Sequence, residues 1–96
     1  MIKYPNTPCI LCAEKHFSTA MCLANEVGYT SLNRQFIIGE LAAAQMHVFT
    51  TYPELANMIR EIRHLVQYRK DAEIDWIPTC LKLNEIAEQC LIDNPI

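Results

Sequence analysis

The sequence predicts an all-α protein, a compact four-helix bundle formed by one domain over residues 1–96. Three observations predict it. The chain has only two glycines and five prolines, 51% of its residues are hydrophobic, and four stretches repeat apolar residues at steps of three and four. The first two links are short, so we expect up-down-up-down topology. The expected helices cover about residues 10–27, 32–49, 53–69 and 76–92.

The first element is expected to be an extended N-terminal arm over residues 1–8, held by Pro5 and Pro8. The helix over 10–27 follows, with one apolar side and a polar side of glutamate, lysine, serine and asparagine. Gly28 is the expected stop, because glycine readily adopts the left-handed conformation that ends helices. The expected apolar face consists of Ile10, Ala13, Phe17, Ala20, Ala24 and Val27.

The second helix, over 32–49, is apolar on nearly every side. A helix of this kind is typical of the centre of a bundle. Its three consecutive alanines and Gly39 would let neighbouring helices approach closely. The large apolar residues expected inside are Phe36, Ile37, Ile38, Leu41, Met46, Val48 and Phe49.

The third helix, over 53–69, begins at the stretch "TYPE". Thr51 followed by Glu54 predicts a capping box, and Pro53 suits a first turn. Leu55, Met58, Ile59, Ile62, Leu65 and Val66 form its expected inner stripe.

The fourth helix, over 76–92, follows a longer link. Asp75 is the expected cap, Pro78 is tolerable in a first turn, and Trp76 is expected in the core. Its expected buried stripe consists of Trp76, Cys80, Leu83, Ala87, Cys90 and Leu91.

Charge and composition narrow the functional classes. The net charge is −3 and the pI is near 5.5, which disfavours nucleic-acid binding. Apolar windows are too short to span a membrane, and the N-terminus lacks the apolar segment of a signal peptide. We therefore expect a cytoplasmic protein whose five cysteines are thiols or metal ligands rather than disulfides.

The stretch "PCILCAEKH" contains the strongest chemical signal. Cys9 and Cys12 are three residues apart, and His16 follows four residues later. The two cysteines could hold one ion from a CxxC knuckle just before the first helix. Cys12 and His16 are one helical turn apart and therefore share an edge. Thiolate and imidazole ligands favour zinc, and a structural zinc site needs a fourth protein ligand.

Helix register suggests that fourth ligand. If the first two helices are antiparallel about their short link, His47 lies level with Cys12. The predicted site is therefore one structural Zn²⁺ bound by Cys9, Cys12, His16 and His47. Cys90 is the alternative fourth ligand, and a water molecule is the third possibility.

Other interpretations of the cysteine pair stay open. Cys9 and Cys12 could be inert core thiols, or a redox pair whose thiolates are favoured at a helix N-terminus. An open zinc site with Glu14 or Glu40 as base would be a hydrolase. The chain has no nucleophile–base set and no glycine-rich phosphate loop, so we expect no catalytic residue and no small-molecule substrate.

Glu40 is the one carboxylate in the apolar second helix. If the second and third helices are also antiparallel, Arg63 lies nearly level with Glu40. We therefore expect an ion pair of Glu40 with Arg63 or Arg60. A functional acid beside a pocket is the alternative.

These inferences predict a small, zinc-stabilised protein that acts in protein–protein interaction or regulation, with a protein partner or as a homo-oligomer. The closest analogy is with the zinc-binding anti-sigma factors, small helical bundles that bind zinc through a histidine and a CxxC and wrap a partner. Their histidine precedes the cysteines, whereas His16 follows them. The analogy concerns mechanism and implies no family membership.

Overall fold

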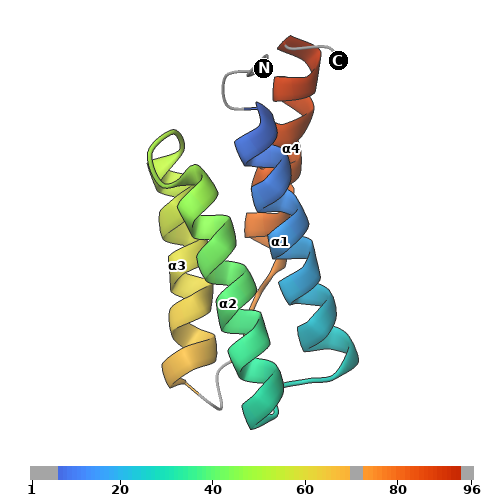
Figure 1. The fold of residues 1–96 in the computed structure, drawn as a ribbon, viewed down its shortest axis with the longest axis vertical. Coiled ribbons are helices and arrows are strands. Elements are labelled where there is room, and N and C mark those ends of the chain that lie inside the picture. Colours follow the sequence, from blue (N-terminus) through green and yellow to red (C-terminus); the bar gives the residue numbers. More distant parts are fainter. Residues whose placement is uncertain (1–6, 70–72, 94–96) are drawn as a thin grey trace.

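The structure, a computed structural model, describes residues 7–69 and 73–93, and all regular structure in these ranges is helical. The four helices are α1 (Thr7–Glu26), α2 (Ser31–Val48), α3 (Pro53–Tyr68) and α4 (Ile77–Asp93). Successive helices run in alternating directions (Figure 1). The predicted four-helix architecture is confirmed, with helix ends within one to three residues of the expected positions.

The start of α1 differs from the prediction. The helix begins at Thr7, so Pro8 and Cys9 are helical rather than part of an extended arm or a knuckle before the helix. Pro8 is compatible with this position because the first turn of a helix needs no donor from its backbone nitrogen. The rest of the expected arm lies outside the described residues.

The helices pack around the bundle in chain order, but not equally. α2 packs on α1 and α3, while α4 packs mainly on α1 and touches α3 much less. α4 therefore packs mainly on the first helix of the chain rather than on the helix that precedes it. Trp76 explains the preference: its ring packs edge-on against Phe17 of α1 at 5.5 Å between centroids, and its Nε1 donates to the Tyr29 hydroxyl at 3.3 Å.

All four helices contribute to the core, and α1, α3 and α4 bury most of their predicted stripes. Trp76 is buried, as predicted, but Val27, which follows the end of α1, and Leu91 of α4 are exposed. Met58, Leu65 and Cys80 are only partly buried. The buried side chains of these three helices and of the residue before α4 include Ile10, Ala13, Phe17, Ala20, Ala24, Leu55, Ile59, Ile62, Val66, Trp76, Leu83, Ala87 and Cys90.

The turn between α1 and α2 is closed by side chains as well as by glycine. Gly28 has φ +87°, as its predicted role requires. Thr30 caps α2 by accepting from the Asn33 backbone nitrogen at 3.2 Å. The buried Asn33 amide donates to the carbonyl of Leu23 at 2.9 Å and to that of Gly28 at 2.6 Å. The Leu23 carbonyl also accepts from the Val27 and Gly28 backbone nitrogens, so the Asn33 amide joins the start of α2 to the bonded end of α1 and its turn.

The predicted N-termini of α3 and α4 have different outcomes. α3 has Tyr52, not Thr51, as its N-cap, and no side chain caps it, so the predicted capping box is wrong. Pro53 occupies the first turn, as expected. Asp75 lies one residue before the cap position of α4, which Trp76 occupies, but its carboxylate accepts from the first backbone nitrogen of the helix, that of Ile77, at 3.2 Å.

α2 is not buried on every side. Its buried stripe is Asn33, Ile37, Leu41, Ala44 and Val48, whereas several of its large apolar side chains are exposed to solvent. The reason is that α2 has neighbours on two sides only, since α4 lies against α1 and does not contact α2. The exposed residues are Leu32, Phe36, Met46 and, just beyond the helix, Phe49.

Candidate functional site

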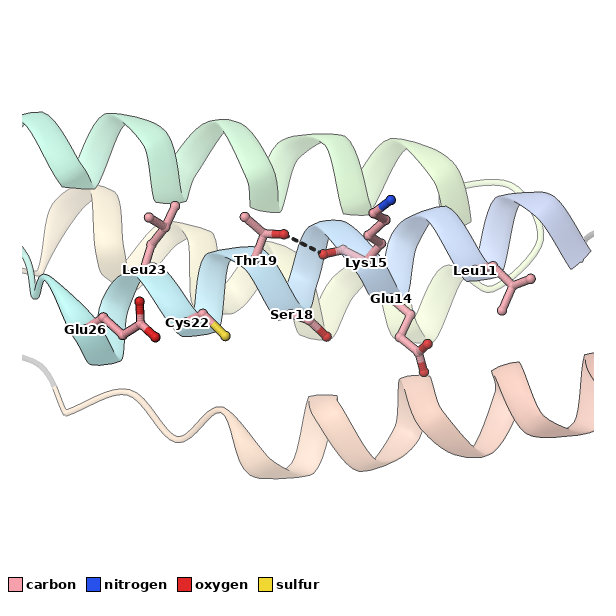
Figure 2. Close-up of a pocket in the computed structure, with 8 residues that line it drawn as sticks. All are labelled: Leu11, Glu14, Lys15, Ser18, Thr19, Cys22, Leu23 and Glu26. Atoms are coloured by element: carbon pink, nitrogen blue, oxygen red, sulfur yellow. Dashed lines mark hydrogen bonds between the residues drawn. The ribbon is translucent and has the colours of Figure 1, made fainter.

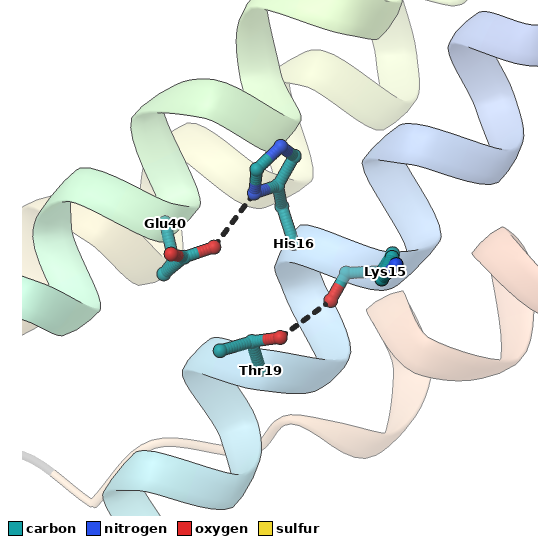
Figure 3. A network of polar contacts seen from close by, with 4 residues as sticks. All are labelled: Lys15, His16, Thr19 and Glu40. Carbon is teal, nitrogen blue, oxygen red and sulfur yellow. Dashed lines mark hydrogen bonds and ion pairs between the residues drawn. The ribbon is translucent and has the colours of Figure 1, made fainter.

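A polar cluster joins the facing edges of α1 and α2. The His16 Nδ1 lies 2.6 Å from the Glu40 Oε2, and the two side chains are 37% and 32% exposed. An ionised carboxylate can only accept a hydrogen bond, so the ring nitrogen donates. In a neutral imidazole this leaves Nε2 with its lone pair, and Figure 3 shows the second ring nitrogen pointing away from Glu40.

His47 lies beside this pair. Its ring stacks on that of His16, with 5.6 Å between centroids and 15° between planes. Glu40 and His47 are two turns apart on α2, and His16 contacts both, so it is level with the segment between them. This placement agrees with the predicted antiparallel register of the first two helices. The structure thus brings together His16 and His47, two of the four predicted metal ligands.

The two cysteines of the predicted site lie further toward the start of α1. Cys12 is a free, exposed thiol one turn before His16. Cys9 lies one turn before Cys12 in α1, and its side chain is outside those that the structure describes. Among the described side chains, no three histidines, cysteines or carboxylates are arranged to hold a metal ion. The four-residue zinc site therefore stays a prediction.

The remaining cysteines have separate environments. Cys22 of α1 is exposed, and Cys80 is partly buried. Cys90, the alternative fourth ligand, is buried in α4, where its Sγ lies 3.3 Å from the Tyr52 hydroxyl. This hydrogen bond, followed by burial and by the charges of Cys90 and Asp93, raises the pKa of Tyr52 to about 12.

The predicted ion pair of Glu40 with Arg63 or Arg60 is wrong. Glu40 turns toward α1 and binds His16, while the Arg63 Nε donates to the Gln45 side-chain oxygen at 3.1 Å. The same register that placed His47 near Cys12 places His16 within a turn of Glu40. The His16–Glu40 contact could have been predicted from the sequence, if Glu40 had been compared with the residues level with it on the first helix as well as on the third.

A surface hollow along α1 gives no sign of catalysis. It has a volume of about 610 Å³ and is open to solvent along the outer side of α1. Figure 2 shows that its side chains project in different directions, and the Thr19 hydroxyl donates to the Lys15 carbonyl of its own helix at 2.9 Å. Its lining residues are Leu11, Glu14, Lys15, Ser18, Thr19, Cys22, Leu23 and Glu26.

Comparison with protein-family models, with curated proteins and with solved structures finds no match to this chain. None of the helices in the described ranges has both the length and the apolar character needed to cross a membrane.

Proposed function

We propose that this chain is a small zinc-binding protein of the cytoplasm that acts through protein–protein contacts. One structural Zn²⁺ would be held by Cys9 and Cys12 of α1 together with His16 and His47. The single observation that carries the proposal is the 2.6 Å contact between the His16 Nδ1 and the Glu40 carboxylate.

That contact has the form expected around a metal-binding histidine. Such histidines generally donate their second ring N–H to a carboxylate or carbonyl, which fixes the tautomer and raises the basicity of the ligating nitrogen. Here Glu40 holds Nδ1, so the metal would bind Nε2 of His16. His47 lies close enough to contribute a second imidazole, since its ring stacks on that of His16. Glu40 itself would orient His16 and would not bind the ion.

The two thiols complete a site that spans two helices. Cys9, Cys12 and His16 lie on successive turns at the start of α1, and His47 comes from α2. Zinc bound in this way would cross-link the start of α1 to the end of α2. Structural zinc contributes an apparent folding free energy on the order of 10 kcal/mol in small domains. A binding free energy of this size would decide whether the N-terminal half of the bundle stays folded.

A binding role fits the surface better than an enzymatic one. The described surface hollows lack a convergent set of nucleophile, base and oxyanion donors. By contrast, several large apolar side chains of α2 are exposed, and contiguous apolar surface is typical of protein–protein contact sites.

Metal analysis of chain purified without chelator tests the zinc site. We expect one zinc ion per chain. Cys12→Ser and His16→Gln should lose it, because each removes a ligand. The matched controls are Cys22→Ser, an exposed thiol on the same helix, and His64→Gln, a histidine on α3. Both controls should keep the metal.

Thiol titration gives a second measurement on the same samples. Two thiols should be protected from a thiol reagent with zinc bound and should become reactive after chelation. A chain that carries no metal and forms a reversible Cys9–Cys12 disulfide would contradict the zinc site and favour the redox switch. Zinc retained in both Cys12→Ser and His16→Gln would contradict the assignment of ligands.

A further inference from the structure

One side of α2 carries apolar residues that nothing in the described chain covers. We define the α2 outer face as Leu32, Phe36, Gly39, Ala43 and Met46, which recur at steps of three and four and so lie on one side of the helix. The side chains of its three large members are 67%, 58% and 80% exposed, in chain order. None of the five residues carries a charge.

No contact within the described residues requires a glycine at position 39, the centre of this face. Its φ is not positive, and a Cβ added there would meet nothing within 4 Å. Glycine inside a helix costs roughly 0.5–1 kcal/mol relative to alanine. The missing side chain leaves room for a second helix to approach the α2 backbone.

The pattern of the face is symmetric about its middle. Phe36 and Met46 lie equally far from residue 41 on either side, and Gly39 and Ala43 lie equally far from it between them. A two-fold axis at residue 41 would place Phe36 against Met46 of a second copy. It would also place Gly39 against Ala43 of the second copy, where the two backbones cross. This match of large with large and small with small makes the face complementary to itself.

The apolar area of the face suits a weak dimer. Its three large members expose roughly 400 Å² per copy, taking large side chains at about 150–250 Å² each. Two copies would bury at most about 800 Å², the size of a weak interface whose occupancy depends on concentration. Antiparallel α2 helices would also oppose their macrodipoles favourably.

We infer that the α2 outer face is a homodimer interface, in which α2 packs antiparallel on α2 of a second copy around Gly39 and Ala43. The inference names the partner for the interaction role proposed above, but it does not depend on zinc. Sulfur–aromatic contact between Phe36 and Met46 of the second copy would add to the packing.

Sedimentation equilibrium of the full chain over a range of concentrations tests the inference. The wild-type mass should rise from 11.0 kDa toward twice that value. Gly39→Leu should remain monomeric, because the new side chain occupies the crossing point of the helices. Phe36→Glu should also remain monomeric, because it places a charge at an apolar contact. Leu81→Glu, which alters a comparably exposed leucine of α4, is the matched control and should dimerise like the wild type.

Thermal unfolding, measured at concentrations where the wild type is monomeric, shows whether a variant that fails to dimerise is still folded. Gly39→Leu should unfold at the same or a higher temperature than the wild type there, since its side chain enters open space and favours helix. A wild type that stays monomeric up to about 1 mM overturns the inference. A dimer that survives both Gly39→Leu and Phe36→Glu overturns it too. Metal content measured on the same samples reports separately on the zinc site.

Discussion

Two side-chain contacts between helices differ in how far they are exposed to solvent. His16 of α1 meets Glu40 of α2 in a contact whose side chains are about one third exposed, with a second imidazole beside it. Tyr52, at the start of α3, meets Cys90 of α4, and that thiol is buried. We call the first the open contact and the second the closed contact.

The difference is that the His16 ring is accessible to a further ligand, whereas the Cys90 thiol is packed inside the bundle. In the open contact, one nitrogen of His16 is bound and the other faces away from Glu40 (Figure 3). In the closed contact, the thiol and the phenol are hydrogen-bond partners, and Cys90 is only 8% exposed. The His16 ring therefore keeps a nitrogen that Glu40 does not contact, whereas the Cys90 thiol lies inside the bundle against Tyr52.

Removal of metal should have the largest effect, and only on the open contact. Chelation should lower the free energy of unfolding by an amount on the order of 10 kcal/mol, because zinc binds the folded chain. Denaturant unfolding followed by circular dichroism, with and without chelator, measures this loss. Cys90→Ala should keep the full response to chelator. A response lost in Cys90→Ala would place zinc in the closed contact instead.

Glu40→Gln should produce the next largest effect. Loss of the carboxylate that orients a ligating histidine typically costs 10- to 100-fold in metal affinity, or about 1.4–2.7 kcal/mol. Competition with a chromophoric zinc chelator measures the affinity. Glu88→Gln, at an exposed glutamate of α4, is the control and should leave it unchanged. Equal affinities in both variants would show that Glu40 has no part in holding zinc.

The closed contact should show its own pH dependence. The pKa of Tyr52 is raised to about 12 from an ordinary value of 10.0, chiefly by its hydrogen bond with Cys90. Below pH 10 the phenol is neutral in both states, so its full contribution to stability is present. Between pH 10 and about 12 the unfolded chain releases this proton while the folded chain keeps it, so the free energy of unfolding falls.

The expected loss over this range is about 1–2 kcal/mol, since one pKa unit corresponds to about 1.4 kcal/mol and Tyr52 is only partly buried. Denaturant unfolding at several alkaline pH values measures it. The difference from Tyr52→Phe isolates this group from the lysines that titrate in the same range. A wild type that loses no more stability than Tyr52→Phe would contradict the raised pKa.

Much of the fold could be predicted because each helix carries its own signals. The apolar steps of α1, the glycine after it and the aspartate before α4 are local features that act within a turn or two. The predicted capping box at Thr51 failed, although it is local, because the chain places Tyr52 at the cap and Pro53 at the first turn. A motif of two residues does not determine which of several neighbouring positions begins a helix.

The neighbours of each helix were harder to predict. The second helix was predicted at the centre of the bundle because its sequence has apolar residues on nearly every side. The contact of Trp76 with Phe17 instead draws α4 onto α1 and leaves Phe36 and Met46 uncovered. The register of α1 on α2 was predictable from their short link and brought His16 and His47 together. The wrong partner for Glu40 came from choosing α3 over α1 as its neighbour, a choice that periodicity does not make.

Tyr52→Phe at neutral pH should have the smallest effect and gives the most direct measure of the closed contact. It removes the hydroxyl that lies 3.3 Å from the Cys90 Sγ but keeps the ring. Net hydrogen bonds in proteins contribute about 0.5–1.5 kcal/mol, and a thiol is a weak partner, so we expect a loss of about 1 kcal/mol. Tyr68→Phe, at an exposed ring of α3, is the control and should cost close to nothing. If both variants unfold alike, the Tyr52–Cys90 contact contributes no stability, and burial alone then separates Cys90 from the thiols proposed to bind zinc.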